Sequence, residues 1–168
     1  METVAAIGAL CPTPLESIEC GNNEFTPETT GTYGGHGMMN VLFIEDDPMN
    51  RRVVKDMLDV AGARLTEADG GEEGLALIEA EDFDVILVDL RMPGMDGFEV
   101  IARIRARTDA KARLPIIVVT ADTAIDLRER CLKAGADEVL FKPVAMDSLF
   151  DAIGRQLARR AEDGGLIG

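Results

Sequence analysis

The stretch DVILVDLRMPGMDGFE (residues 84–99) decides the fold predicted for this chain. After Asp84, the four residues 85–88 are continuously apolar, a pattern typical of a strand covered on both faces of a sheet. This run ends at Asp89, and a turn containing Pro and Gly follows. Asp96 then precedes Gly97 at the start of a helical pattern, where turn or capping work accounts for it. Asp89 is therefore the acid with a candidate chemical role.

The same alternation of strand and helix patterns continues on both sides of this stretch. Five segments in succession are strand-like, and each is followed by a helical pattern. The strand-like segments are 40–44, 63–68, 84–88, 115–119 and 138–141, and the helical ones are 48–61, 70–81, 98–107, 123–135 and 146–160. Five such units predict an α/β fold: a doubly wound five-stranded parallel sheet, in the order 2-1-3-4-5, with helices on both faces.

The first helical segment carries its own start signal. Asp47 is the predicted cap, and Pro48 occupies the first turn, where proline is tolerated. The apolar residues predicted to form one stripe are Met49, Val53, Met57 and Ala61, joined by Val54 and Leu58.

Polar side chains follow the strands at the points where they end. Glu45, Asp46 and Asp47 follow the first strand, Asp89 the third, Thr120 the fourth and Lys142 the fifth. In the predicted order the first and third strands are neighbours, and ligands of such sheets bind beyond the carboxyl ends of the strands. We therefore expect these groups to converge at one rim.

The chemistry of this set points to phosphate and a hard cation. Carboxylates placed together repel one another, and a cation relieves that repulsion. Because every candidate ligand is an oxygen, Mg²⁺ or Mn²⁺ fits best. Lys142 suits phosphate oxygens, Thr120 can donate a hydrogen bond, and a carboxylate can attack phosphorus. The set predicts metal-assisted phosphoryl transfer onto a carboxylate.

Four blocks resemble the receiver domains of two-component response regulators, the flavodoxin-like CheY fold. They are VLFIEDDPMNR (41–51), DVILVDLRMPGMDGFE (84–99), LPIIVVTAD (114–122) and KAGADEVLFKP (133–143), in the family's order and spacing. The similarity spans about residues 39 to 160. It implies a single-domain response regulator that receives a phosphoryl group and signals by phosphorylation-dependent interaction, at most catalysing its own phosphorylation and dephosphorylation.

By this resemblance Asp89 matches the phosphoacceptor. Glu45 and Asp46 match the acidic pair that binds Mg²⁺, with Glu45 in place of the commoner aspartate. The metal ligands implied are Glu45, Asp46, Asp89 and the backbone carbonyl of Arg91.

Other matched positions surround the predicted phosphorylation site. Thr120 matches the hydroxyl residue that reports the phosphoryl group, and Lys142 matches the lysine that pairs with it, with a cis peptide implied at Lys142–Pro143. Arg91 and Asp122 occupy flanking positions that could tune water access. Val139 stands where the family often has an aromatic residue, so the usual threonine–aromatic coupling is missing.

Composition excludes several other functions. The net charge of −14 argues against nucleic-acid binding and against an anionic membrane surface, since both need clustered basic residues. No apolar run reaches transmembrane length. Three cysteines without metal spacing favour a reducing compartment, and hence a cytoplasmic location. The one histidine, His36, is a poor candidate for a phosphodonor.

Three segments are predicted along the chain. Residues 1–37 hold five glutamates and no Lys, Arg or Asp, and their turn formers predict an extension that is disordered or loosely docked. Residues 38–160 form the predicted receiver domain, and 161–168 a short C-terminal tail. The opening METVAAIGALC lacks a positive n-region, so we do not predict a signal peptide. A natural start at Met38 or Met39 stays open.

Several functions and partners remain open from sequence alone. One alternative is a pseudo-receiver that binds partners without phosphorylation. Another is a haloacid-dehalogenase-like phosphohydrolase, although that chemistry wants an acid where Arg91 stands. The implied partners are a sensor histidine kinase or histidine phosphotransfer protein and a downstream protein target. By resemblance, the face of the fourth helix, fifth strand and fifth helix is a candidate surface for partners or a homodimer.

Overall fold

The computed structural model of the protein describes residues 37–164, in which five strands and five α-helices alternate. The elements are β1 (Asn40–Ile44), α1 (Pro48–Val60), β2 (Arg64–Ala68), α2 (Gly71–Ala80), β3 (Val85–Val88), α3 (Gly97–Arg105), a 3₁₀-helix (Ala110–Arg113), β4 (Ile116–Thr120), α4 (Leu127–Ala134), β5 (Glu138–Phe141) and α5 (Met146–Gly164). His36, most of the predicted N-terminal extension and residues 165–168 lie outside the described residues. The predicted segment boundaries therefore stay predictions.

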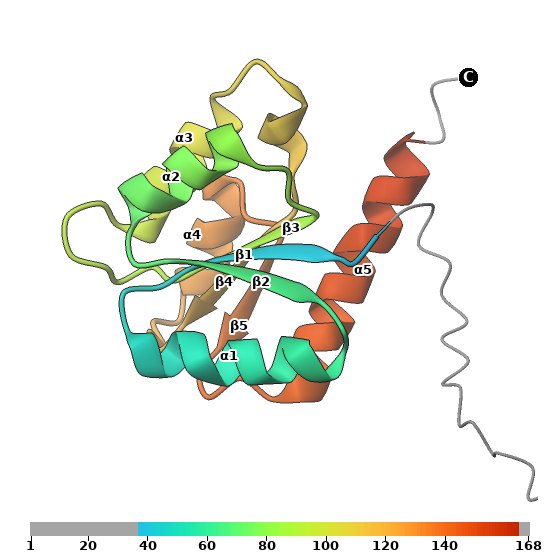
Figure 1. Cartoon of the computed structure of the whole chain (residues 1–168). Helices are drawn as coiled ribbons and strands as arrows, with labels where there is room; N and C mark the ends of the chain where they lie inside the picture. Colours follow the sequence, from blue (N-terminus) through green and yellow to red (C-terminus); the bar gives the residue numbers. More distant parts are fainter. Residues whose placement is uncertain (1–36, 165–168) are drawn as a thin grey trace, which may run out of the picture. The chain divides into compact units, whose positions relative to one another are not determined.

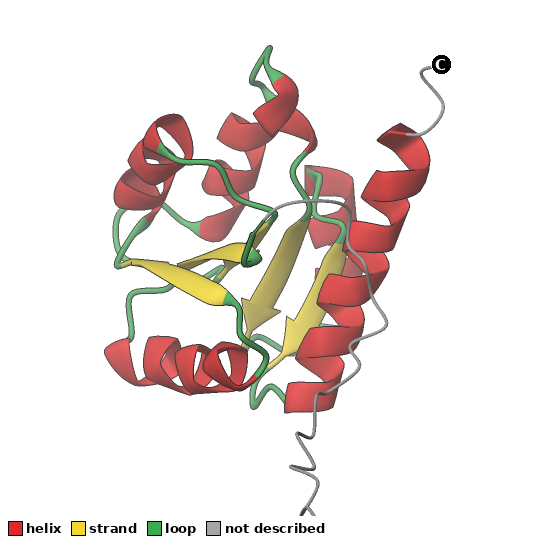
Figure 2. Ribbon diagram, turned by 45° about the vertical axis from the view of Figure 1, so that its right-hand side comes forward, coloured by secondary structure: helices red, strands yellow, loops and turns green. Residues whose placement is uncertain are grey.

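The five strands form one parallel sheet in the order β2-β1-β3-β4-β5, as the sequence predicted. Helices α1 and α5 cover one face of the sheet, and α2, α3 and α4 cover the other (Figures 1 and 2). In this topology the chain leaves β1 for one neighbouring strand and later returns to β3 on its other side. The carboxyl ends of β1 and β3 thus lie together at the point where the direction of winding reverses.

Two apolar layers hold the helices to the sheet, one on each face. Alternate strand residues point into them: Val41, Phe43, Val85 and Leu87 toward α1 and α5, and Leu42, Ile44, Ile86 and Val88 toward α2, α3 and α4. Because both faces are covered, β1 and β3 have almost no water-facing positions. This burial explains why their sequences are continuously apolar rather than alternating.

The predicted apolar stripe of α1 is wrong in part. Val54 and Leu58 are buried against the sheet, and Met57 packs beside them, but Met49 is 71% exposed and Val53 is 50% exposed. Ala61 follows the helix and is exposed. Adjacent positions on an α-helix point about 100° apart, and here Val54 faces the sheet while Val53 lies on the edge of the helix that is open to solvent.

Some element ends also differ from the predicted ones. Thr120 is the last residue of β4 rather than the first residue past it, and α5 continues to Gly164. Helix α4 starts at Leu127 rather than at 123. Residues 123–126 are not helical. The Asp122 side chain accepts a hydrogen bond from the Ala124 N–H, a local bond that competes with helix formation.

The two predicted helix caps are confirmed. Asp47 Oδ1 accepts a hydrogen bond from the Met49 N–H (2.8 Å) at the start of α1, with Pro48 in the first turn. Asp96 Oδ1 accepts one from the Glu99 N–H (2.9 Å) at the start of α3. Asp96 therefore has the structural role assigned to it, and it is not one of the three acids that cluster at the ends of β1 and β3.

Candidate functional site

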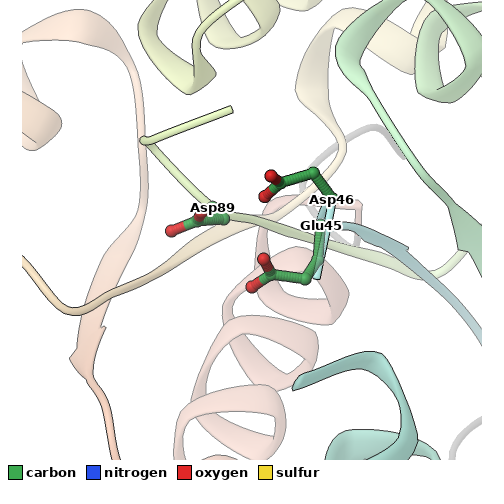
Figure 3. Close-up of side chains that lie close together, drawn as sticks. All are labelled: Glu45, Asp46 and Asp89. Atoms are coloured by element: carbon green, nitrogen blue, oxygen red, sulfur yellow. The ribbon is translucent and has the colours of Figure 1, made fainter. Parts of the chain in front are cut away.

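Glu45, Asp46 and Asp89 meet at the carboxyl ends of β1 and β3 (Figure 3). Ile44 is in register with Val88, and the Asp89 N–H donates to the Ile44 carbonyl, so the residues that follow these strands are neighbours. One carboxylate oxygen from each of the three acids lies within 4.8 Å of the other two. The structure therefore brings together the acids that the sequence placed at one rim, while their roles stay predictions.

Two of these acids are unusually buried for charged groups. Glu45 is 1% exposed and Asp89 is 5% exposed, whereas Asp46 is more accessible. Burial is the main cause that raises the pKa of Glu45 and of Asp89, because it disfavours the ionised form. Nearby Lys142 opposes the rise in both cases. The cluster is thus short of positive charge, which a bound cation would supply.

Lys142 reaches this cluster from the end of β5. Its Nζ lies 2.5 Å from Glu45 Oε2 and 3.5 Å from Asp89 Oδ1. Lys142 is joined to Pro143 by a cis peptide bond, as the resemblance implied. The ammonium group thus lies closer to Glu45, a predicted metal ligand, than to Asp89, the predicted phosphoacceptor.

The carboxylate arrangement fits a small hard cation. Mg²⁺ binds oxygens at about 2.1 Å, so two ligands on opposite sides of one ion lie roughly 4.2 Å apart. The three carboxylate oxygens all lie within 4.8 Å of one another, which is close enough for one such ion, directly or through a water, to bind all three. The carbonyl of Arg91, two residues beyond Asp89, stays the predicted fourth protein ligand.

Thr120 and Asp122 lie on the β4 side of the site. Thr120 is fully buried, and its Oγ1 accepts a hydrogen bond from the Asp122 N–H (3.1 Å). Its hydroxyl hydrogen remains able to donate. Asp122 also accepts a hydrogen bond from Arg91 Nη2 (2.7 Å), and this bond lowers the pKa of the Asp122 carboxyl. Val139, in place of the common aromatic residue, is buried in the apolar layer.

Arg51 is a supporting residue that the sequence analysis missed. Its Nη1 donates to the carbonyls of Glu45 (2.7 Å) and Asp46 (3.2 Å), and its Nε lies 3.3 Å from Glu67. Arg51 therefore fixes the backbone that carries the two acids. A basic residue one turn into the helix that follows the acidic pair was the available signal.

Comparison with known proteins shows the family to which the chain belongs. The model of the response regulator receiver domain matches residues 41–154, which is more than half of the chain. The chain belongs to the response regulator receiver domain family. Receiver domains are signalling domains of two-component systems. The family match and the strand order therefore confirm the predicted family and fold.

The curated relatives are much longer proteins. The receiver is 37% identical over 127 residues to the virulence sensor protein BvgS of Bordetella pertussis, a match that covers 73% of this chain and 10% of BvgS. It is 35% identical over 123 residues to the sensor histidine kinase RcsC of Salmonella typhi, covering 73% of this chain and 13% of RcsC. The chain thus spans only a small part of these sensor proteins.

Two solved structures show the similarity at the level of the domain. One is the receiver domain of the sensor histidine kinase PA1611 from Pseudomonas aeruginosa PAO1, with a magnesium ion coordinated in its active site cleft. It is 34% identical with a TM-score of 0.67, covering 73% of this chain and 99% of that one. The chemotaxis response regulator CheY4 of Vibrio cholerae is 30% identical with a TM-score of 0.65, covering 71% and 99%. Within residues 37–164, no helix has the length and apolarity needed to cross a bilayer.

Proposed function

We propose that this receiver accepts a phosphoryl group on Asp89 and signals by phosphorylation-dependent interaction with a protein partner. The observation that carries the proposal is the convergence of Asp89, Glu45, Asp46 and Lys142 at the carboxyl ends of β3, β1 and β5. Such a set can position a carboxylate nucleophile and neutralise the charge of a transferred phosphoryl group.

The donor we propose is a phosphohistidine of a sensor histidine kinase or histidine phosphotransfer protein, supported by the similarity to sensor kinases. A carboxylate oxygen of Asp89 attacks phosphorus, the P–N bond breaks, and its electron pair stays on the imidazole nitrogen. The products are an aspartyl phosphate and a histidine. Hydrolysis later returns the carboxylate and releases inorganic phosphate. This self-directed chemistry is the only catalysis proposed.

We further propose that Mg²⁺, or Mn²⁺, binds Glu45, Asp46, Asp89 and the carbonyl of Arg91. The ion would supply positive charge to the phosphoryl oxygens during transfer. Within the protein, Lys142 holds positive charge beside both buried acids, and the Thr120 hydroxyl can donate to a phosphoryl oxygen. That the protein acts in the cytoplasm, and as a single-domain regulator, stays a prediction.

The proposal is tested by incubating the protein with acetyl phosphate and Mg²⁺ and measuring its intact mass. We expect a phosphoryl adduct that is stable in acid and labile in base. EDTA and the substitution Asp89→Asn should each abolish it, while Asp96→Asn, which changes the other acid of the same loop, should not. An adduct that persists in Asp89→Asn would contradict the assignment.

The alternatives give different results in the same experiment. A pseudo-receiver takes no phosphoryl group from acetyl phosphate or from a cognate kinase, and the buried Val139 is the feature that favours it. A phosphohydrolase turns over phosphate monoesters steadily. The residue two places after Asp89 is Arg91, which pairs with Asp122 and offers no acid there.

A further inference from the structure

Asp122 connects the two loops that flank Asp89. Its Oδ2 accepts a hydrogen bond from Arg91 Nη2 (2.7 Å), in the loop after β3. Its Oδ1 accepts from the Ala124 N–H (3.0 Å), and its own N–H donates to Thr120 Oγ1 (3.1 Å) at the end of β4. One residue therefore holds both the arginine beside the proposed phosphoacceptor and the threonine proposed to contact the phosphoryl group.

The Arg91 guanidinium is held by one acid and belongs to the same loop as another. Its Nη2 bonds Asp122 (2.7 Å), and Arg91 follows Asp89 by two residues in the loop after β3. A phosphoryl group on Asp89 would carry more negative charge and more acceptor oxygens than the Asp122 carboxylate. Arginine binds phosphate through its planar fork of N–H donors. The phosphoryl group and Asp122 would thus compete for the same guanidinium.

Resting on the proposed function, we propose that the Arg91–Asp122 ion pair is a latch. Asp122 is a positioning residue that holds the Arg91 guanidinium away from Asp89 until a phosphodonor or phosphoryl group draws it across. The latch slows phosphorylation by an anionic donor, since it occupies the one arginine that could meet that donor from the loop after β3.

The exposure of the pair sets the expected size of the effect. The Arg91 side chain is 75% exposed and the Asp122 side chain 22% exposed. Ion pairs at such positions are weak and break readily, which suits a device that must open. The corresponding change in rate is about two- to fivefold.

Asp122→Asn opens the latch with little other change. Asparagine keeps an oxygen that can accept from the Ala124 N–H, and its backbone N–H still donates to Thr120. Arg91→Gln removes the guanidinium while it keeps the backbone carbonyl proposed as a metal ligand. Glu99→Gln is the control for charge, because it likewise removes one negative charge and one arginine–carboxylate ion pair, with Arg103 on the exposed side of α3.

The experiment is a double-mutant cycle on the rate of phosphorylation by acetyl phosphate with Mg²⁺, at donor concentrations below saturation. In this reaction an Asp89 oxygen attacks phosphorus, the bond from phosphorus to the acetyl oxygen breaks, and acetate leaves. We expect Asp122→Asn to raise the rate about two- to fivefold. We expect Arg91→Gln to slow the reaction more in the Asp122→Asn background than in the wild type, because the freed guanidinium then acts on the donor.

Melting curves separate this role from a structural one, since we expect the Asp122→Asn midpoint to match that of the wild type. Equal rates for Asp122→Asn and Glu99→Gln would reduce the effect to net charge and overturn the latch. Independent effects of the two substitutions, multiplying in the double variant, would also overturn it. If no variant, including the wild type, takes up a phosphoryl group, the proposed function fails, and the latch fails with it.

Discussion

Lys142 and Glu45, which are 97 residues apart in the chain, form a salt bridge of 2.5 Å across the carboxyl ends of β5 and β1. Glu45 is almost fully buried, so this bridge compensates a charge that has little access to water. Asp89, 3.5 Å from the same ammonium group, shares that compensation. The acids and the lysine therefore form one coupled charge set, and removing any member should change how the others behave.

Lys142→Met should destabilise the fold by about 1–3 kcal/mol, because it leaves two buried carboxylates without their ammonium partner. Mg²⁺ should restore more stability to this variant than to the wild type, since the cation replaces the lost positive charge. Urea denaturation with and without Mg²⁺ measures both effects. Lys133→Met, which breaks an exposed pair with Glu129 on α4, is the control and should change little. Equal unfolding free energies for the two variants would refute the coupling.

Asp89→Asn should stabilise the protein at pH 7 in EDTA. Burial raises the pKa of Asp89 above its ordinary value of 3.8, so the native state holds its proton more tightly than the unfolded chain does. The wild type therefore loses stability as the pH rises from about that value, and the neutral variant does not. Thermal melting should show a gap between the two proteins that closes near pH 4.

The same variant should lose stabilisation by the metal. A ligand present at 100 times its Kd adds about 2.7 kcal/mol to the stability of a protein that binds it only when folded. We expect Mg²⁺ to raise the melting temperature of the wild type and of Asp96→Asn, which retains its cap. The rise should be much smaller in Asp89→Asn. An equal rise in all three proteins would place the ion elsewhere.

Gly97→Ala should disturb Asp89 through the backbone. A Cβ at position 97 would clash with the Asp89 carbonyl oxygen and would come within 2.8 Å of the Leu90 Cα, and backbone atoms yield little. We expect a loss of stability of about 1–3 kcal/mol, with slower phosphorylation in the molecules that remain folded. Gly164→Ala, where a Cβ meets no atom within 4 Å, is the control. Denaturant titration and the acetyl phosphate assay measure the two effects, and a Gly97→Ala protein with wild-type stability would contradict this packing.

The sequence predicted the sheet order from the succession of five strand–helix units, and it predicted the convergence of acids from where the apolar runs stop. A buried strand must be apolar, so the first polar residue after it marks the rim of the sheet, as Asp89 does. Capping was equally local, and Asp96 was assigned correctly from the residues beside it. These features depend on short-range patterns, which a sequence contains in full.

The pairings within the site could not be predicted in the same way. The Lys142 ammonium group lies closer to Glu45 than to Asp89. Arg91, in the loop after β3, pairs with Asp122, in the loop after β4. Such choices depend on side-chain rotamers and on distances between residues far apart in the chain. The prediction of which face of α1 is buried was wrong in part for a related reason. The adjacent apolar residues Val53 and Val54 allowed two orientations of the helix, and packing against the sheet buries Val54.

Glu138, at the start of β5, should make stability depend on pH. Burial alone would raise the pKa of this carboxyl, but hydrogen bonds from Arg155 and Gln156 on α5 outweigh burial and lower it below its ordinary 4.5. A lowered pKa means that the unfolded chain binds the proton more readily than the native state does. The stabilisation is therefore present above about pH 4.5 and is lost as the pH falls through the lower native value.

We accordingly expect Glu138→Gln to cost about 1–2 kcal/mol at pH 7, because it removes the charge that ties β5 to α5. The difference from the wild type should shrink steadily below about pH 4.5, where the unfolded chain takes up a proton that the native carboxylate of Glu138 still resists. Urea denaturation at a series of pH values measures this difference. Glu162→Gln, on the exposed part of α5, provides the matched charge change and should follow the wild type. A gap between Glu138→Gln and the wild type that stays constant from pH 7 to pH 3 would show that lost packing, rather than the charge on Glu138, sets the cost.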